Sequence, residues 1–346
     1  MTAQRPFEEV RTLLLERAGE RRNPFDRTDP RTAERIVRGL RSTAHDEWVP
    51  AFGVAAQACE RDIDAYGYWR VARYPAPTSP LKRDAYRRSQ EHYLRAMAAE
   101  QPLLETVRTP FRGREGEGTA VEAHLRVPAR AGRRPLVVMW GGIDSFKEER
   151  RPEPYLAAGF ATLGIDMPGV ADAPLAGSTD AERMWDPIFD WVGTRAELDP
   201  ERVAVMGNST GGYWATKLSR THRHRIRAAV DNGGPVHDSF TPAWIARAQV
   251  GEYPFELAET LAAAFGGSTY DDWVRIAPSL SLVGLGILDQ PSAPLLAVHG
   301  EDDTVFPVTD ARRLIDAGAD ALIVPGGHLS GDTTGAIVRW LAVRLV

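Results

Sequence analysis

A reactive serine is indicated by the pattern Gly-x-Ser-x-Gly at positions 207–211, in which the serine stands between two glycines. An apolar run from Val203 to Met206 precedes it, and an Ala/Leu/Lys-rich segment with helical periodicity follows it. A strand, a sharp turn and a helix are the setting of a nucleophile elbow, in which glycines let the two backbones approach closely. The helix N-terminus behind the serine favours developing negative charge. We therefore predict that Ser209 is a nucleophile.

A serine hydroxyl becomes nucleophilic when a histidine takes its proton, and a carboxylate must orient that histidine. Among the eight histidines, His328 follows the last apolar run on a glycine-bearing loop, so we predict that it is the base. His299, His222 and His224 are expected to be structural or solvated.

The carboxylate is expected just after the penultimate apolar run, where Asp302 and Asp303 stand side by side. We favour Asp303 and keep Asp302 as the alternative. The resulting chain order of Ser209, Asp303 and His328 is typical of enzymes that have this serine turn. Three such residues at three separate strand ends predict attack on a carbonyl group.

Carbonyl chemistry also needs backbone donors where negative charge develops on the substrate oxygen. One donor is expected to be the N–H of Thr210, next to the nucleophile. The second is expected from the loop after the first long apolar run, with Gly142 or Ile143 as the donor. The candidate substrate contacts stand beside these donors in the sequence: Asp144, Trp140 and Tyr213.

The elements that must position these residues are buried strands that alternate with helices. Two alternating runs at 106–111 and 119–127 predict an antiparallel pair, and short apolar runs then recur at 136–140, 160–165, 203–206, 226–230, 295–298 and 321–324. This alternation is typical of the α/β class, with a mostly parallel sheet and helices on both faces. Residues 235–290 are expected to be a helical insertion that caps the carboxyl edge of the sheet.

Residues 1–104 are expected to form a helical domain ahead of a core domain at 105–346. Apolar spacing predicts one long helix from Asp46 to Tyr74 with Asp46 as its N-cap, and Ser79 and Pro80 predict the start of a second helix. The aromatic residues of these helices are expected to pack the helices together, with the lining of a substrate cavity as the alternative: Tyr66, Tyr68, Trp69, Tyr86 and Tyr93.

The composition of the 346 residues, 43% apolar and 26% charged, is that of an ordinary globular protein. A net charge of -5 without a basic stripe argues against nucleic acid as a partner. One cysteine, Cys59, excludes an intrachain disulfide framework, and no zinc-type spacing occurs, so no metal and no other cofactor is expected. No signal peptide and no long apolar run is found, so we expect a soluble, cytoplasmic protein that acts on a small molecule and not on a membrane.

Four segments carry a resemblance to the α/β-hydrolase superfamily: LVVMWGGIDSFKEE at 136–149, GNSTGGYWATKLS at 207–219, LLAVHGEDDTVFP at 295–307 and GGHLS at 326–330. Within it, the chain resembles the group that includes the FrsA-like esterases and 2,6-dihydropseudooxynicotine hydrolase, a carbon–carbon bond hydrolase. DAYGYWRVARYP and YRRSQEHYLRAM resemble that group's extra helical domain. The resemblance implies Ser209 as nucleophile, Asp303 as acid and His328 as base, and it implies a homodimer formed through the helical domain.

Two departures from that group bear on the reaction. Asp144 stands where the carbon–carbon hydrolase has a functionally important glutamate, so its side chain is one methylene shorter. DMPGVADAP lacks the second glycine of the usual Asp-x-Pro-Gly-x-Gly turn, which predicts a different path for residues 169–174. The run from Lys147 to Glu149 is expected to be a solvated helix start, with ligand contact as the alternative.

The expected function is a serine-dependent hydrolase that cleaves an ester or a ketone carbon–carbon bond. The aromatic residues of the 235–290 insertion favour a bulky, apolar or aromatic substrate. One alternative is a lyase of polyketide (tetronate) biosynthesis that eliminates acetate from an O-acetylated intermediate, with His328 as the base and Asp144 as an extra carboxyl group. Another is a non-catalytic, FrsA-like binding or regulatory protein.

Overall fold

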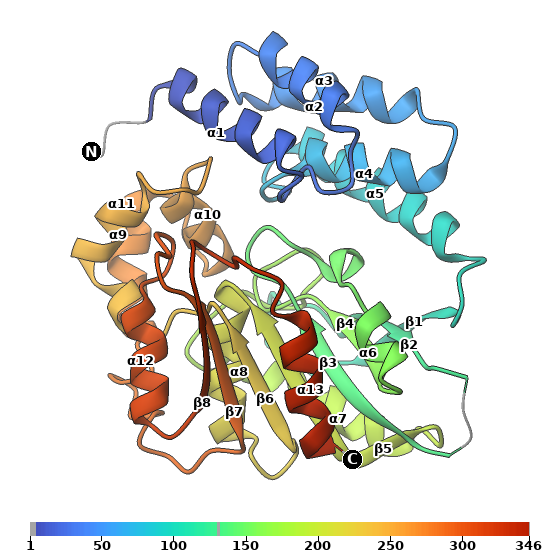
Figure 1. Ribbon diagram of the computed structural model, residues 1–346, viewed down its shortest axis with the longest axis vertical. Helices are drawn as coiled ribbons and strands as arrows, with labels where there is room; N and C mark the ends of the chain where they lie inside the picture. The colour runs from blue at the N-terminus through green and yellow to red at the C-terminus, as the bar shows by residue number, and fades with distance from the viewer. Residues whose placement is uncertain (1–4, 130–131, 346) are drawn as a thin grey trace. The chain divides into compact units, whose positions relative to one another are not determined.

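The computed structural model describes residues 5–129 and 132–345 of the chain. These residues form two compact units (Figure 1). The first unit contains Met1–Leu103 together with Glu252–Leu257, and the second contains Leu104–Gly251 and Ala258–Val346. The short segment 252–257 lies in the insertion that was expected to belong to the core domain, so the sequence did not indicate its place in the first unit.

The second unit is built on an eight-stranded sheet in the order β1-β2-β4-β3-β5-β6-β7-β8. Strand β2 (Ala120–Arg126) is antiparallel to both of its neighbours, β1 (Leu104–Pro110) and β4 (Ala161–Ile165). The parallel part continues through β3 (Arg134–Trp140), β5 (Leu198–Asn208), β6 (Ala228–Asn232), β7 (Leu295–Gly300) and β8 (Asp320–Val324). Each apolar run found in the sequence overlaps one strand, which confirms the α/β-hydrolase fold.

Helices cover both faces of this sheet (Figure 1). One face packs on α6 (Glu153–Ala157) and α13 (Thr334–Leu345), where Leu341 and Leu345 contact a core that includes Val137, Met206 and Val230. The other face carries η2 (Ala181–Trp185), α7 (Asp186–Thr194) and α8 (Thr210–Thr221), and α12 (Val308–Asp316) connects β7 to β8. The central strands, such as β3, β4, β6 and β7, are apolar on both faces because both faces are covered.

The insertion between β6 and β7 is helical, with η3 (Asp238–Phe240), α9 (Pro242–Ala248), α10 (Leu257–Ala264), α11 (Tyr270–Ile276) and η4 (Ala277–Leu280). Its first residues are held by Asp310 of α12, a fully buried carboxylate. That carboxylate accepts the backbone N–H groups of residues 236 to 239. Phe265 stacks on Trp214, and Phe240 packs edge-on against Tyr213, so the insertion adjoins the start of α8.

The first unit contains α1 (Phe7–Gly19), α2 (Pro30–Gly39), α3 (His45–Gln57), α4 (Asp62–Arg73) and α5 (Pro80–Met97). The prediction of one long helix from Asp46 to Tyr74 is wrong, because the chain turns between α3 and α4. The indole N–H of Trp48 donates to the carbonyl of Val71, 23 residues on. Those residues would lie about 35 Å apart in a continuous helix, so burial of Trp48 requires the turn.

The start of the following helix is confirmed, since the Ser79 hydroxyl accepts the Lys82 N–H and Pro80 occupies the first turn of α5. Asp46 is not the N-cap of α3, which begins at His45 after Ala44. The aromatic residues of α4 and α5 are buried among the helices, with the rings of Tyr66 and Tyr93 5.2 Å apart. The packing interpretation is therefore confirmed for Tyr66 and Tyr93, whereas Tyr68 lines a cavity of the first unit.

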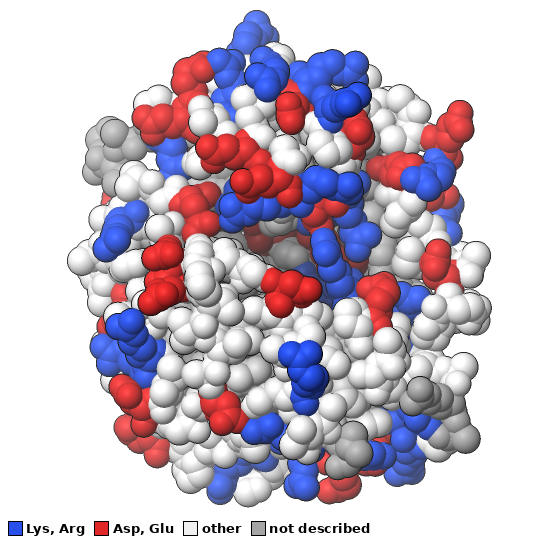
Figure 2. Space-filling model, in the orientation of Figure 1, with Lys and Arg blue, Asp and Glu red and all other residues white. Residues whose placement is uncertain are grey.

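Segment 252–257 completes the core of the first unit. The Phe255 ring lies 5.4 Å from that of Trp48 and 5.3 Å from that of Tyr74, both in edge-on geometry. Arg17 donates to the carbonyl of Glu252. Among the described residues, no helix is both long enough and apolar enough to cross a membrane. On the face drawn in Figure 2, basic and acidic side chains are interspersed.

Candidate active site

Ser209 lies at the tip of a sharp turn between β5 and α8, with φ 55° and ψ -135°. A positive φ is strained for a residue with a side chain and is a mark of functional turns. The flanking glycines are required by close approach, because a Cβ on Gly207 would lie 2.0 Å from the Gly211 carbonyl oxygen. A Cβ on Gly211 would lie 2.3 Å from the carbonyl oxygen of Gly141. The spacing read from the sequence is thus explained by the geometry of the turn.

The structure brings Ser209, His328 and Asp303 together at the ends of three strands. His328 Nε2 lies 2.8 Å from Ser209 Oγ, and His328 Nδ1 lies 2.7 Å from Asp303 Oδ2. Asp303 is buried beside the histidine, whereas Asp302, the alternative acid, is exposed. Because a carboxylate accepts the Nδ1 proton, Nε2 is left to accept the serine proton.

Asp303 is held in one orientation by its own loop. Its Oδ1 accepts the backbone N–H groups of Val305 at 2.7 Å and Phe306 at 3.0 Å. Burial alone would raise the pKa of this carboxyl group, but the charge and hydrogen bond of His328, the charge of His299 and the N–H of Phe306 together hold its pKa below the usual value. Asp303 is therefore ionised at neutral pH. An ionised carboxylate is what stabilises the imidazolium form of the histidine beside it.

His299 is a neighbour of this group that sequence reasoning placed among the structural or solvated histidines. Its Nε2 lies 3.0 Å from the carbonyl oxygen of Phe306 and 3.3 Å from Asp303 Oδ2. The side chain is 1% exposed. The spacing of four residues between His299 and Asp303, around a glycine, is the signal in the sequence that points to this contact. His222 instead pairs with Asp186, and His224 is exposed.

The loop after β3 lies against the nucleophile. A Cβ built on Gly142 would lie 3.1 Å from Ser209 Oγ and 3.4 Å from the backbone nitrogen of Thr210. The Gly142 backbone therefore lies close to both the serine hydroxyl and the Thr210 N–H. Ile143, the alternative second donor, is buried in the same loop.

The three candidate substrate contacts differ in their surroundings. Trp140 is fully buried, and its indole N–H donates to the Gly211 carbonyl at 2.8 Å. We therefore correct the assignment of Trp140 from a substrate contact to a support of the serine turn. Tyr213 is 1% exposed and lies edge-on to Trp214 and Phe240. Asp144 is half-buried on the loop that carries Gly142.

The run from Lys147 to Glu149 is not a solvated helix start, because all three residues are buried in η1 (Lys147–Glu149). The Lys147 ammonium lies 3.0 Å from Asp166, 3.1 Å from Glu148 and in contact with Asp172. Burial alone would lower the pKa of Lys147, but these carboxylates raise it well above its usual value. An ion-paired cation thus ties the end of the Gly142 loop to the loop after β4.

Two residues of the loop after β4 have left-handed backbone conformations. Gly169 has φ 80° and Ala171 has φ 48°. A Cβ on Gly169 would lie 1.8 Å from the carbonyl oxygen of Ala264, so the loop packs closely on the insertion. Ala171 stands where the usual turn has its second glycine, and it keeps the left-handed conformation that glycine favours. The neighbouring Asp172 contacts Lys147.

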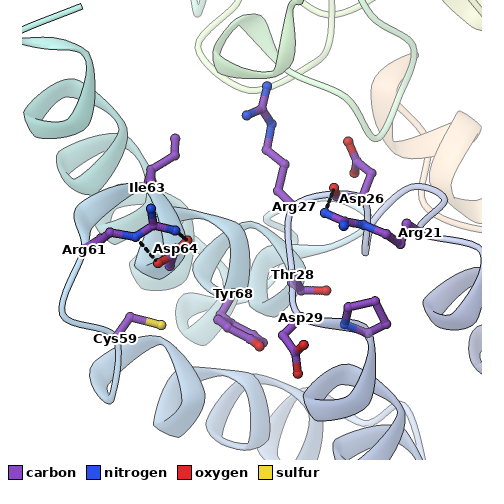
Figure 3. Close-up of a pocket in the computed structure, with 11 residues that line it drawn as sticks. Arg21, Asp26, Arg27, Thr28, Asp29, Cys59, Arg61, Ile63, Asp64 and Tyr68 are labelled. Atoms are coloured by element: carbon purple, nitrogen blue, oxygen red, sulfur yellow. Dashed lines mark hydrogen bonds and ion pairs between the residues drawn. The ribbon is translucent and has the colours of Figure 1, made fainter.

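A cavity of about 620 Å³ lies within the first unit (Figure 3). Its lining includes both signs of charge, but Asp29 accepts the Thr32 N–H at the start of α2. Arg61 is paired with Asp64 at 2.7 Å. Because these groups stabilise the helices that carry them, we place the candidate active site at Ser209 and not here.

Comparisons with known proteins identify the family and the fold of this chain. A family model described as esterase FrsA-like matches residues 53–330. Esterase FrsA of Photobacterium profundum is 24% identical over 311 residues, which cover 85% of this chain and 71% of the relative. The match to esterase FrsA of Vibrio vulnificus, at 26% identity, covers 71% of this chain but only 59% of the relative.

Two solved structures share the fold over almost the whole chain. AbyA5 has a TM-score of 0.79 at 22% identity, covering 97% of this chain and 93% of its own. The 2,6-dihydroxy-pseudo-oxynicotine hydrolase has a TM-score of 0.66 at 18% identity, covering 99% and 91%. Because the family model matches most of the chain and the sheet and serine turn agree with it, this chain belongs to the FrsA-like esterase family of the α/β-hydrolase superfamily.

Proposed function

We propose that this protein is a serine hydrolase that cleaves an ester, or the carbon–carbon bond of an activated ketone, in a bulky small molecule. The observation that supports this most is the position of His328, which is within hydrogen-bond distance of both Ser209 Oγ and Asp303 Oδ2. A binding protein has no need of a serine, a histidine and an aspartate arranged in this way on a strained turn.

In the proposed reaction, His328 Nε2 takes the hydroxyl proton as Ser209 Oγ attacks the substrate carbonyl. The Thr210 N–H, with that of Gly142 or Ile143, holds the resulting oxyanion. His328 then gives its proton to the leaving alcohol, or to the leaving carbon for a ketone, and an acyl-serine forms. Water attacks the acyl-serine with the same histidine as base, which releases the acid and restores the serine.

The substrate class that we propose is bulky and apolar or aromatic. Support comes from the aromatic side chains beside the nucleophile helix, where Tyr213 adjoins Phe240 and Trp214 adjoins Phe265. The hydrolase found among the structural neighbours is named for an oxynicotine, an aromatic compound. Aromatic residues close to a nucleophile favour large apolar ligands over small polar ones.

The test of the function needs no knowledge of the substrate. A fluorophosphonate probe should label the full chain at one residue, and Ser209→Ala should abolish the labelling. Turnover of an activated ester should fall by about 10⁴-fold in the same variant, because the triad supplies most of the catalysis. Unchanged turnover in Ser209→Ala would rule out this mechanism. No labelling of the natural chain would favour the binding-protein alternative.

A second candidate function is the elimination of acetate from an O-acetylated substrate, for which Asp144 is the motivating observation. This carboxyl group lies two residues after Gly142, half-buried, and plain ester hydrolysis gives it no task. In elimination, His328 would remove a proton from carbon while the oxyanion donors hold the leaving acetate.

Heavy-oxygen water separates the two reactions, given an acetate ester that has an acidic C–H next to the acetoxy carbon. Hydrolysis puts one solvent oxygen into the acetate and gives an alcohol. Direct elimination leaves both original oxygens in the acetate and gives an alkene. Unlabelled acetate with an alkene would overturn the hydrolase proposal.

A further inference from the structure

We propose that His299 is a positioning residue for the triad: its Nε2–H lies 3.3 Å from Asp303 Oδ2 and stabilises by charge the oxygen that orients His328. This inference rests on the proposed function, because it assigns a task within the triad reaction. It concerns a residue that touches neither the substrate nor the serine.

The hydrogen-bond partners of His299 fix which ring nitrogen carries the proton. Nε2 lies 3.0 Å from the Phe306 carbonyl oxygen, which can only accept a hydrogen bond. Nε2 is therefore protonated, and the same N–H lies 3.3 Å from Asp303 Oδ2. The contact with Asp303 is therefore an attraction between this N–H group and the carboxylate, and not a repulsion between two acceptors.

The two residues are held by different kinds of structure. His299 lies in β7, which is paired on one side with β6 and on the other with β8. Asp303 lies four residues later on the loop that follows the strand, with the Asp303 N–H facing the Gly300 carbonyl. A side chain on a paired strand is more rigid than one on a loop, so His299 can fix the carboxylate more firmly than the loop alone.

The surroundings of His299 are acidic. Asp303 faces it directly, and the buried carboxyl group of Asp231 at the end of β6 interacts with its charge. Asp310 of α12 interacts with Asp231 in turn, and His328 faces Asp303 from the loop after β8. The His299 N–H group thus lies near three carboxyl groups. Its removal should change the stability of the Asp303 carboxylate most, because that is the one in contact with it.

This arrangement predicts the direction of an effect on His328. The His299 N–H group partly cancels the negative charge of Asp303 at the His328 ring. When this N–H group is removed, His328 experiences a stronger negative potential from Asp303. The imidazolium form of His328 is then favoured, so its pKa rises. Because the base must be neutral to take the serine proton, the acid limb of the rate profile must move to higher pH.

The experiment compares His299→Leu, which removes the donor, with His299→Gln, which carries an N–H group. The readout is the second-order rate of fluorophosphonate labelling of the full chain between pH 5 and 9. His299→Leu should label about tenfold more slowly at neutral pH, with the acid limb shifted upward by about one pH unit. His299→Gln should recover the natural limb and most of the rate. His222→Leu is the matched control and should match the natural chain.

Two results would overturn the proposal: a folded His299→Leu protein with the natural profile, or equal losses in the Leu and Gln variants with no shift of the limb. If His299→Leu does not fold, His299→Asn replaces it, since its shorter amide does not reach Asp303 and should show the same shift. Failure of the natural chain to label at Ser209 would instead contradict the proposed function, so the two failures are distinguishable.

Discussion

The indole N–H of Trp140 donates to the carbonyl oxygen of Gly211 at 2.8 Å, and this bond joins the end of β3 to the first turn of α8. The loop that carries Gly142 starts from Trp140, and Ser209 precedes Gly211 by two residues. The distance between the proposed oxyanion donors is therefore set by one buried hydrogen bond, although neither partner takes part in the chemistry.

Trp140→Phe is expected to keep the ring packing but leave the Gly211 carbonyl without its donor. The free energy of unfolding should fall by about 1–3 kcal/mol, the cost of an unpaired buried acceptor. Labelling of Ser209 should slow as well, because the two loops lose their fixed spacing. Trp340→Phe is the matched control, since its indole N–H bonds an exposed Asp320. Equal effects of the two changes in urea denaturation would contradict the role given to Trp140.

Gly142→Ala is expected to reduce activity with little effect on the fold. The added Cβ would lie 2.9 Å from Ser209 Cβ and 3.1 Å from Ser209 Oγ, so it fills the space proposed for the oxyanion. A loss of about 10²-fold or more in kcat is expected, comparable to the removal of an oxyanion donor. Gly193→Ala serves as the control, because a Cβ there has nothing within 4 Å. Natural kcat in Gly142→Ala would place the oxyanion elsewhere.

Lys147→Met is expected to destabilise the protein by about 3 kcal/mol or more, because it removes the cation from a buried group of carboxylates. The effect should depend on pH. Burial raises the pKa of Asp166 to about 6, above its value in the unfolded chain. The stability that protonated Asp166 contributes is thus present at low pH and is lost as pH rises through 6.

With Lys147 removed, only protonation relieves the repulsion among these carboxyl groups. The loss in melting temperature should therefore be larger at pH 8 than at pH 5. Lys147→Arg keeps the charge and should show a smaller, less pH-dependent loss. A penalty in Lys147→Met that is the same at both pH values would mean that packing and not charge explains it.

We propose that this protein is a homodimer in solution. In the first unit, Val54, Leu81 and Leu94 are 67%, 45% and 40% exposed, which is apolar surface that a partner can cover. Light scattering at micromolar concentration should give twice the 38.1 kDa mass of one chain. Val54→Glu with Leu94→Glu should shift the mass toward one chain and leave probe labelling unchanged. A single-chain mass for the natural protein would contradict the prediction.

The sheet and the triad could be predicted from the sequence because each depends on short local patterns of residues. Ser209 and Asp303 follow buried strands that are continuous apolar runs, and His328 follows the apolar run of the more exposed strand β8. The break between α3 and α4 was missed because apolar spacing continues through it, and only the Trp48 contact with Val71 requires a turn.

The roles of charged and aromatic residues were harder to predict from the sequence, because they depend on partners that are distant in the chain. A Lys-Glu-Glu run is solvated in most proteins, and here it is buried because Asp166 and Asp172 come from another loop. Trp140 reads as a candidate ligand contact until its N–H is seen to bond Gly211. His299 lacks a local mark that separates it from any strand histidine, apart from its spacing to Asp303.

The membership of residues 252–257 in the helical unit has a consequence for the order of events during synthesis. The five helices leave the ribosome first, yet Phe255, which packs on Trp48 and Tyr74, follows only after β1 to β6 have been made. At about 5–20 residues per second, that interval lasts on the order of 10 s. During this interval, part of the aromatic core of the helical unit stays uncovered. This is therefore the stage of synthesis at which a chaperone would matter most.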